Sequence, residues 1–288
     1  MTLLLAIAFG LIIGLSLGAL GGGGSILTVP ALVYAVGETA QAATTGSLVI
    51  VGVTAAAAAV GHARAGRVRW WAGLAFGVAG IPASVAGTAL NARVAPDALL
   101  VSFAVLMIVA ALAMLAKTMV PARPAEVADD EEAARLRTPA AVGGDRGSAP
   151  ATGPARPAAP ARSSRIGTAL KVLAAGLVVG FLTGFLGVGG GFIIVPALVL
   201  ALHYDMPAAV GTSLLVISLN SGVALLARGS DGVFHWSVIV PFTVAAVLGS
   251  LAGKRVADRI SGASLTRSFA VLLLVVAAYV LLRARTGS

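Results

Sequence analysis

A glycine-rich segment occurs twice in this chain, and the duplication constrains the fold more than any other feature. The first copy is Gly-Gly-Gly-Gly-Ser-Ile-Leu-Thr-Val-Pro-Ala-Leu at residues 21–32, and the second is Gly-Val-Gly-Gly-Gly-Phe-Ile-Ile-Val-Pro-Ala-Leu at residues 187–198. Pro30 and Pro196 lie 166 positions apart. The same offset pairs other residues without a gap: Gly14 with Gly180, Trp70 with Trp236, and Gly87 with Gly253. Matched Gly, Pro and Trp residues over about a hundred positions indicate a duplicated unit.

The composition places the chain in a membrane. Of its 288 residues, 58% are hydrophobic and 11% are charged, and the mean hydropathy is +0.99. A water-soluble protein carries about a quarter charged residues, so a soluble core cannot hold this much apolar surface. Apolar runs of roughly 20 residues, enough to cross a bilayer as helix, recur in both halves, and the alternating pattern of a β-barrel is absent. The net charge of +9 lies mostly in loops and one linker, which indicates membrane topology rather than nucleic-acid binding.

These runs predict an all-α polytopic membrane protein with two inverted-topology repeats, each made of a glycine-broken helical hairpin plus three transmembrane helices. The first membrane repeat covers residues 1–116 and the second covers 167–288. Residues 117–166, rich in Ala, Pro, Arg and Gly, are expected to form a disordered cytoplasmic linker. The expected helices of the first repeat are 3–20, 25–36, 40–61, 70–90 and 98–116. Those of the second are 167–186, 192–203, 207–227, 236–254 and 265–283.

The loop charges indicate that the two repeats are inserted in opposite senses. The loop at 62–69 carries three Arg, whereas its equivalent at 228–235 carries one Arg and one Asp. The next loops reverse the bias, because four basic residues lie within 254–267 and a single Arg lies within 91–97. Cytoplasmic loops carry the excess of Lys and Arg. We therefore expect a multi-pass protein of a bacterial cytoplasmic membrane, with both termini outside and the linker in the cytoplasm.

Glycine-broken helices at matching positions of inverted repeats predict a binding site near the bilayer midplane. Each glycine run precedes a helix whose first N–H groups have no partner within the helix and carry the positive end of its dipole. Two such N-termini that converge would bind an anion through amides and hydroxyl groups. The candidate substrate-binding residues are Gly21, Gly22, Gly23, Gly24, Ser25, Thr28, Pro30, Ser47, Gly187, Gly189, Gly190, Gly191, Phe192, Pro196, Ser213 and Asn220.

Some of these residues also have a structural interpretation. The glycines would allow close helix packing and tight hairpins without any ligand. Ser47, Ser213, Asn220 and its repeat equivalent Thr54 either line the site or link membrane helices by hydrogen bonds. Thr183, near the second turn, is a further candidate for the lining.

Coupling to an ion gradient is less visible in the sequence. Glu38 and Asp205 each lie at the start of an expected helix, where they either cap it or act as proton-linked gates. His62, His203 and His235 fall at expected ends of spans, where an interfacial position competes with a proton relay. Uniport, or a symport or antiport whose proton travels on the substrate, remains open.

The repeated glycine run followed by Val-Pro-Ala-Leu, together with the downstream Ala-Ala and Ser-Leu pairs, resembles the sulfite exporter TauE/SafE family, also called the 4-toluene sulfonate uptake permease family. The resemblance covers both repeats and excludes the linker, which is longer than the family implies. It implies a secondary transporter of a small sulfur-containing anion such as sulfite, thiosulfate or an organosulfonate, working by alternating access.

Other classes fit the sequence less well. A passive anion channel is the alternative, although no filter motif is present. An intramembrane enzyme is not expected, because the histidines and carboxylates lie almost entirely outside the apolar runs. The absence of a P-loop excludes an ATP-driven transporter at the level of this chain. We expect no catalytic residue, no metal and no cofactor, and the absence of cysteine excludes thiolate ligands. The expected partners are the anion and the lipid bilayer but no nucleic acid, and a homo-oligomer is left open.

Overall fold

The computed structural model describes residues 2–91, 93–94, 96–119, 162–186, 191–228 and 234–286, and within these ranges it is entirely helical apart from turns and short connections. The first half contains α1 (Thr2–Leu20), α2 (Gly23–Pro30), the π-helical segment η1 (Ala31–Val36), α3 (Ala40–Arg64), α4 (Trp70–Asn91) and α5 (Pro96–Met119). The second half contains α7 (Arg162–Leu186), α8 (Gly191–Leu200), α9 (Met206–Arg228), α10 (Trp236–Ala257) and α11 (Gly262–Thr286).

Eight of these helices are long and apolar enough to cross a membrane, and α8 and the α2–η1 unit are shorter. Their outward faces carry large apolar side chains such as Val78, Val85 and Leu226, which suits contact with lipid. Trp70, Trp71 and Trp236 are exposed at helix starts, where indole rings favour the membrane interface. The all-α polytopic fold expected from composition is therefore confirmed.

The first glycine break is shorter than expected. Gly21 has a φ of +78°, a left-handed conformation that glycine adopts without a steric penalty. Gly22 then precedes α2 as its N-cap residue, and Gly23 and Gly24 already belong to the first helical turn. The prediction of a break over residues 21–24 was wrong by two residues.

The predicted linker is shorter at both ends than expected, because α5 continues to Met119 and α7 begins at Arg162. Residues 120–161 lie outside the described ranges.

Helix α3 differs from expectation at both ends. Thr39 caps its N-terminus, because the Thr39 hydroxyl accepts a hydrogen bond from the Ala42 N–H at 3.3 Å. Glu38 is therefore not the cap. At the other end the helix continues to Arg64 rather than stopping at residue 61, and Gly66 ends it with a φ of +71°. This extension places His62 inside the helix.

Glycines bring the two halves into close contact along two helix pairs. In the first, α1 packs against α10, and a Cβ placed on Gly14 or Gly18 would lie 2.0 or 2.1 Å from the carbonyl oxygen of Ala246 or Ser250. In the second, α7 packs against α4, and a Cβ on Gly184 would lie 1.9 Å from the Ser84 carbonyl oxygen. Backbones that approach this closely replace the hydrophobic effect as the attraction between helices in lipid. Each repeat thus packs its first helix on the other repeat.

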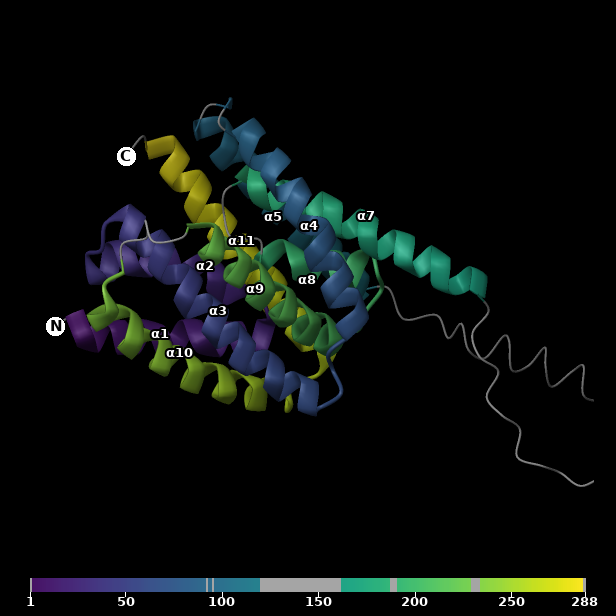
Figure 1. Ribbon diagram of the computed structural model, residues 1–288, viewed down its shortest axis with the longest axis horizontal. Coiled ribbons are helices and arrows are strands. Elements are labelled where there is room, and N and C mark those ends of the chain that lie inside the picture. The colour runs from purple at the N-terminus through teal and green to yellow at the C-terminus, as the bar shows by residue number, and fades with distance from the viewer. Residues whose placement is uncertain are drawn as a thin grey trace, which may run out of the picture.

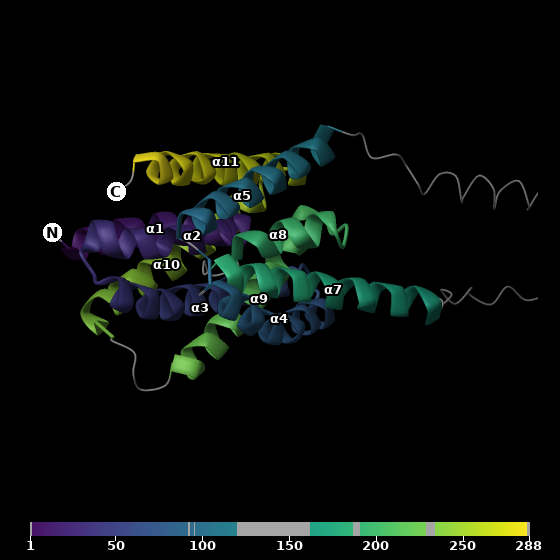
Figure 2. The same ribbon diagram turned by 90° about the horizontal axis from the view of Figure 1, so that it is seen from above.

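The equivalent helices α3 and α9 lie antiparallel to each other. A Cβ on Gly52 would lie 3.0 Å from the Ser221 Cβ, and near the end of α3 the His62 Cβ lies 3.2 Å from a Cβ placed on Gly211, near the start of α9. Both chain termini lie at one end of the bundle, whereas α5 ends and α7 begins at the opposite end (Figures 1 and 2).

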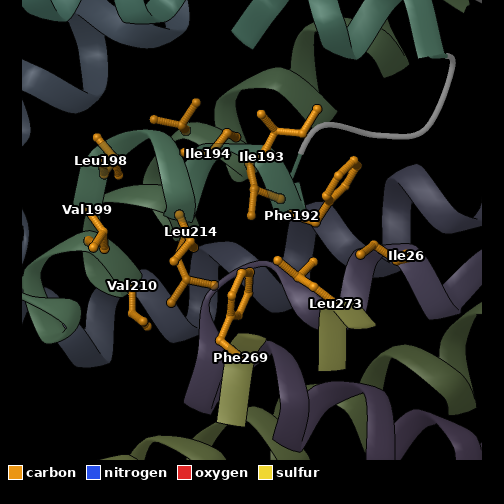
Figure 3. Close-up of a cluster of buried hydrophobic side chains, with 14 of the residues drawn as sticks. Ile26, Phe192, Ile193, Ile194, Leu198, Val199, Val210, Leu214, Phe269 and Leu273 are labelled. Carbon is orange, nitrogen blue, oxygen red and sulfur yellow. The ribbon is translucent and has the colours of Figure 1, made fainter. Parts of the chain in front are cut away.

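The short helix α8 lies in the interior of the bundle. Figure 3 shows Phe192, Ile193 and Ile194 of α8 among Val210 and Leu214 of α9 and Phe269 and Leu273 of α11, with Ile26 of α2 nearby. Phe192 also meets Phe103 of α5 edge to face, with ring centroids 5.0 Å apart. The start of α8 is therefore fixed by packing on several sides.

Candidate functional site

The N-termini of α2 and α8 meet inside the protein. A Cβ placed on Gly22 would lie 2.0 Å from the carbonyl oxygen of Gly191, the first residue of α8. Only a backbone without a side chain can make this contact, so glycine is required at position 22. Both glycines are buried. The starts of α2 and α8, far apart in sequence, are therefore neighbours in the fold.

Two serine hydroxyls line this contact. Ser25 Oγ donates to the Gly22 carbonyl oxygen at 2.8 Å, and it would lie 2.5 Å from a Cβ placed on Gly191. Ser213 of α9 lies on the other side of the turn, where its hydroxyl is 2.8 Å from the Val210 carbonyl oxygen and 3.3 Å from that of Gly21. Both hydroxyls have a local carbonyl partner, and rotation about their C–O bonds would let them serve a ligand instead.

The electrostatics of this region come from the backbone. The first N–H groups of α2 and α8 have no acceptor within their own helices, and each helix places the positive end of its dipole at the junction. Neither residues 1–63 nor residues 172–227 contain Lys or Arg. Among the described residues, no group of three His, Cys, Asp or Glu side chains is placed to hold a metal ion. The backbone thus polarises the junction positively, and α1, α2 and α8 contribute no Lys or Arg to it.

A model of the family described as sulfite exporter TauE/SafE matches residues 6–280, which includes both glycine turns and all the long helices. The chain belongs to the sulfite exporter TauE/SafE family. It is a multi-pass membrane transporter of that family, and its eight apolar helices suit a bacterial cytoplasmic membrane.

Curated relatives of this family member cover nearly its whole length. A "Probable membrane transporter protein" from Xylella fastidiosa (strain Temecula1) is 30% identical over 98% of this chain and 96% of its own. "Probable membrane transporter protein YunE" from Bacillus subtilis is 25% identical over 96% of this chain and 94% of its own. No solved structure matches the chain significantly.

The structure of this TauE/SafE member brings together only part of the predicted site. Gly21, Gly22, Ser25, Gly191 and Ser213 lie around the junction of the two turns. Gly23 and Gly24 follow in the first turn of α2, and a Cβ on Gly23 would meet the Leu272 side chain at 2.4 Å. The remaining glycines of the second run, Gly187, Gly189 and Gly190, lie outside the described residues.

Other predicted site residues lie along the helices. Thr28 is buried and donates to the Gly24 carbonyl oxygen at 2.9 Å, and Pro30 is exposed at the end of α2. Pro196 is buried within α8. Asn220 is half-buried on α9, with its Oδ1 3.8 Å from a Cβ placed on Gly77.

Ser47 and Ser213 do not share one location. Each lies about two turns from the start of its helix, and α3 and α9 are antiparallel, so the two hydroxyls lie toward opposite ends of the pair. Ser47 is buried and its Oγ donates to the Thr44 carbonyl oxygen at 2.8 Å.

Sequence reasoning missed several polar contacts. His62 is buried in the last turn of α3, and its Nε2 lies 3.1 Å from the Gly18 carbonyl oxygen. Glu38 meets His235 with a carboxylate oxygen 2.5 Å from Nδ1, at the end of the bundle where α10 begins. The only sequence signal for this second contact was that both residues flank expected spans, and a partner 197 positions away cannot be read from that.

The opposite end of the bundle carries a cluster of charges. Asp258, just after α10, pairs with Arg67 and with Lys254, the latter at 2.8 Å. The hydrogen bond from Lys254 and the Arg67 guanidinium hold the pKa of the Asp258 carboxyl below its usual range. Nearby, Lys117 Nζ donates to the Val199 carbonyl oxygen at 2.6 Å, which ties the end of α5 to α8. Burial raises the pKa of the Tyr204 phenol in the connection between α8 and α9.

Proposed function

We propose that this transporter moves a small sulfur-containing anion, such as sulfite, thiosulfate or an organosulfonate, across the membrane. The contact between Gly22 and Gly191 carries the proposal, because it joins the N-termini of two short helices inside an apolar bundle. Amides at helix N-termini bind oxyanions, and a region without Lys or Arg releases them more readily than a charged clamp would. The family description supports the class of anion.

In the proposed mechanism, the anion is bound by the first amides of α2 and α8 together with the Ser25 and Ser213 hydroxyls. The backbones of Gly22 and Gly191 touch in this structure, so the turns must separate to admit an anion. Alternating access would follow from movement of one repeat against the other around this junction. The pairing of α1 with α10 and of α7 with α4 constrains such a movement, since each repeat would carry one helix of the other with it.

We further propose that the two repeats have inverted topology, with the linker in the cytoplasm. The antiparallel arrangement of the equivalent helices α3 and α9 supports the inversion. Arg67 follows the end of α3 and Lys254 lies in the last turn of α10, and both helices run toward the end of the bundle where α5 ends and α7 begins (Figure 1), which supports a cytoplasmic linker.

Transport by the purified protein in liposomes tests the function. Labelled sulfite, thiosulfate and an organosulfonate should each be measured for uptake and for exchange against unlabelled anion. Gly22→Ala should abolish transport, because its Cβ meets backbone that cannot rotate away. Gly222→Ala on α9 is the matched control, since a Cβ there has no atom within 4 Å among the described residues, and it should transport as wild type does.

The same assay separates a carrier from a passive anion channel. A carrier saturates, and unlabelled anion on the far side accelerates the uptake of label; a channel shows neither property. Normal transport by a folded Gly22→Ala variant would refute the glycine junction as the site. A wild-type protein that moves none of the three anions would refute the proposed substrate class.

A further inference from the structure

One buried histidine has no role in the proposed anion site. His62 is 1% exposed, and its Nε2 lies 3.1 Å from the Gly18 carbonyl oxygen. A carbonyl oxygen only accepts hydrogen bonds, so Nε2 must carry the hydrogen and Nδ1 must hold a lone pair. That Nδ1 atom is buried and has no hydrogen-bond partner among the described residues. Buried polar atoms of this kind are rare, and here the unpartnered atom is a base.

His62 contacts both elements that form the first half of the junction. Gly18 lies three residues before Gly21 on α1, about 5 Å along the helix axis. On α9, a Cβ placed on Gly211 would lie 3.2 Å from the His62 Cβ, and Ser213 follows two residues later. Ser213 in turn reaches the Gly21 carbonyl oxygen. The imidazole therefore lies about one helical turn along α1 from Gly21.

Burial of the ring and the charges around it together set when it binds a proton. Three charged side chains act on it: Arg67 from the connection after α3, and Lys254 and Asp258 from α10 and the residue that follows it. Helices α1 and α9 contribute no charged side chain at their contacts with it. The two cations oppose an imidazolium, whereas Asp258 and the carbonyl end of α1 favour it. An anion at the adjacent turn would add a further favourable charge.

We propose that His62 is the proton-binding site that couples anion movement to a proton gradient. The proposal rests on the proposed function, because the bound anion is the charge that stabilises the imidazolium. Nδ1 takes up one proton from a hydronium ion of the bulk water as the anion binds, with an O–H bond breaking as the N–H bond forms, and it returns the proton to water when the anion leaves. The equivalent position in the second repeat is Arg228, so a titrating group occurs in only one of the two copies.

Anion transport by His62→Gln, measured both with and without a proton gradient, tests the proposal. The Gln amide keeps a donor for the Gly18 carbonyl oxygen but cannot take up a proton. The substrate should be an organosulfonate, which stays ionised when the pH changes, whereas sulfite itself takes up a proton near neutral pH. We expect exchange without a gradient to stay within about twofold of wild type, and gradient-driven accumulation to fall by about tenfold or more. His203→Asn, at an exposed position with a φ of 55°, should leave both unchanged.

Three results would overturn the proposal. They are full gradient-driven accumulation by His62→Gln, a wild-type protein that exchanges anion without moving protons, and a wild-type protein that exchanges none of the three anions. The last result refutes the proposed function as well, whereas the first two leave it intact.

A measurement that does not alter His62 covers the case in which His62→Gln fails to fold. The chain has three histidines, so the double variant His203→Asn/His235→Gln leaves His62 as the only imidazole. Its ¹⁵N spectrum should show Nδ1 as a lone-pair nitrogen at high pH and as a protonated nitrogen at low pH. Addition of the organosulfonate should move this change toward higher pH. An Nδ1 that stays unprotonated through the pH range of coupled transport would overturn the proposal.

Discussion

The two repeats use the same packing but carry different chemistry. Gly18 of α1 and its equivalent Gly184 of α7 each press their backbone against a serine carbonyl on the other repeat. The ends of the bundle differ: one carries Asp258 with two basic partners, and the other carries the Glu38–His235 pair. Backbone packing is the same in both repeats because it holds the bundle together. Polar side chains can differ between the repeats where they act at only one end of the bundle. The predictions below test the two parts of this comparison.

The largest effect is expected from bulky residues in the shared packing. Gly18→Leu and Gly184→Leu would place a Cβ 2.1 and 1.9 Å from the carbonyl oxygens of Ser250 and Ser84, so whole helices must separate. Overpacking costs about 1–3 kcal/mol even where side chains can move, and more is expected here. Both variants should lose monodisperse protein in size-exclusion chromatography, whereas Gly222→Leu should not. A normal elution profile for only one of the two variants would show that the α1–α10 and α7–α4 pairs are not equivalent.

A second effect should distinguish the two faces of the membrane. Arg93 and Arg259 are repeat equivalents after α4 and α10, and both are exposed. The chain has no cysteine, so single Arg93→Cys and Arg259→Cys variants report one position each. In inside-out vesicles, an impermeant thiol reagent should label position 259 and spare position 93, and intact cells should give the reverse. Labelling of both positions from one side would disprove the inverted topology.

A smaller effect is expected at Thr54, the repeat equivalent of Asn220. Thr54 Oγ1 is buried and has no hydrogen-bond partner among the described residues. Thr54→Val removes an unsatisfied hydroxyl at nearly constant shape, so thermal stability should stay the same or rise by about 1 kcal/mol. If the hydroxyl serves the anion, the KM for transport should increase. Thr243→Val, whose hydroxyl donates to the Ile239 carbonyl oxygen, is the control. An unchanged KM would exclude Thr54 from the substrate path.

The smallest effect should come from Asp258 at the charged end. Because the pKa of the Asp258 carboxyl is lowered in the folded protein, its carboxylate stabilises the fold at pH values above the ordinary pKa of Asp. This contribution is lost as the pH falls through the lowered pKa. The side chain is 32% exposed, so the contribution is about 0.5 kcal/mol or less. Asp258→Asn should therefore lower the Tm slightly at pH 7 and leave it unchanged at strongly acidic pH. A decrease in Tm of equal size at both pH values would show that the effect comes from packing instead.

The sequence alone determined most of the helical framework. The duplication, the apolar runs and the family motif predicted the order of the helices and the glycine turns, because hydrophobic length and glycine punctuation are local properties of the chain. Helix ends were less accurate: Gly23 and Gly24 joined α2, and α3 continued past His62, since capping by Thr39 and the left-handed Gly66 depend on the folded backbone.

Only the tertiary structure decided which residues meet. It joined Gly22 to Gly191, separated Ser47 from Ser213, and placed His62 behind Gly18 with a nitrogen left unpartnered among the described residues. Each result depends on how helices from different repeats cross, and contacts between residues far apart in the chain leave no periodic trace in one sequence. The repeat predicted two glycine turns, and only the fold brings Gly22 of the first against Gly191 at the start of α8.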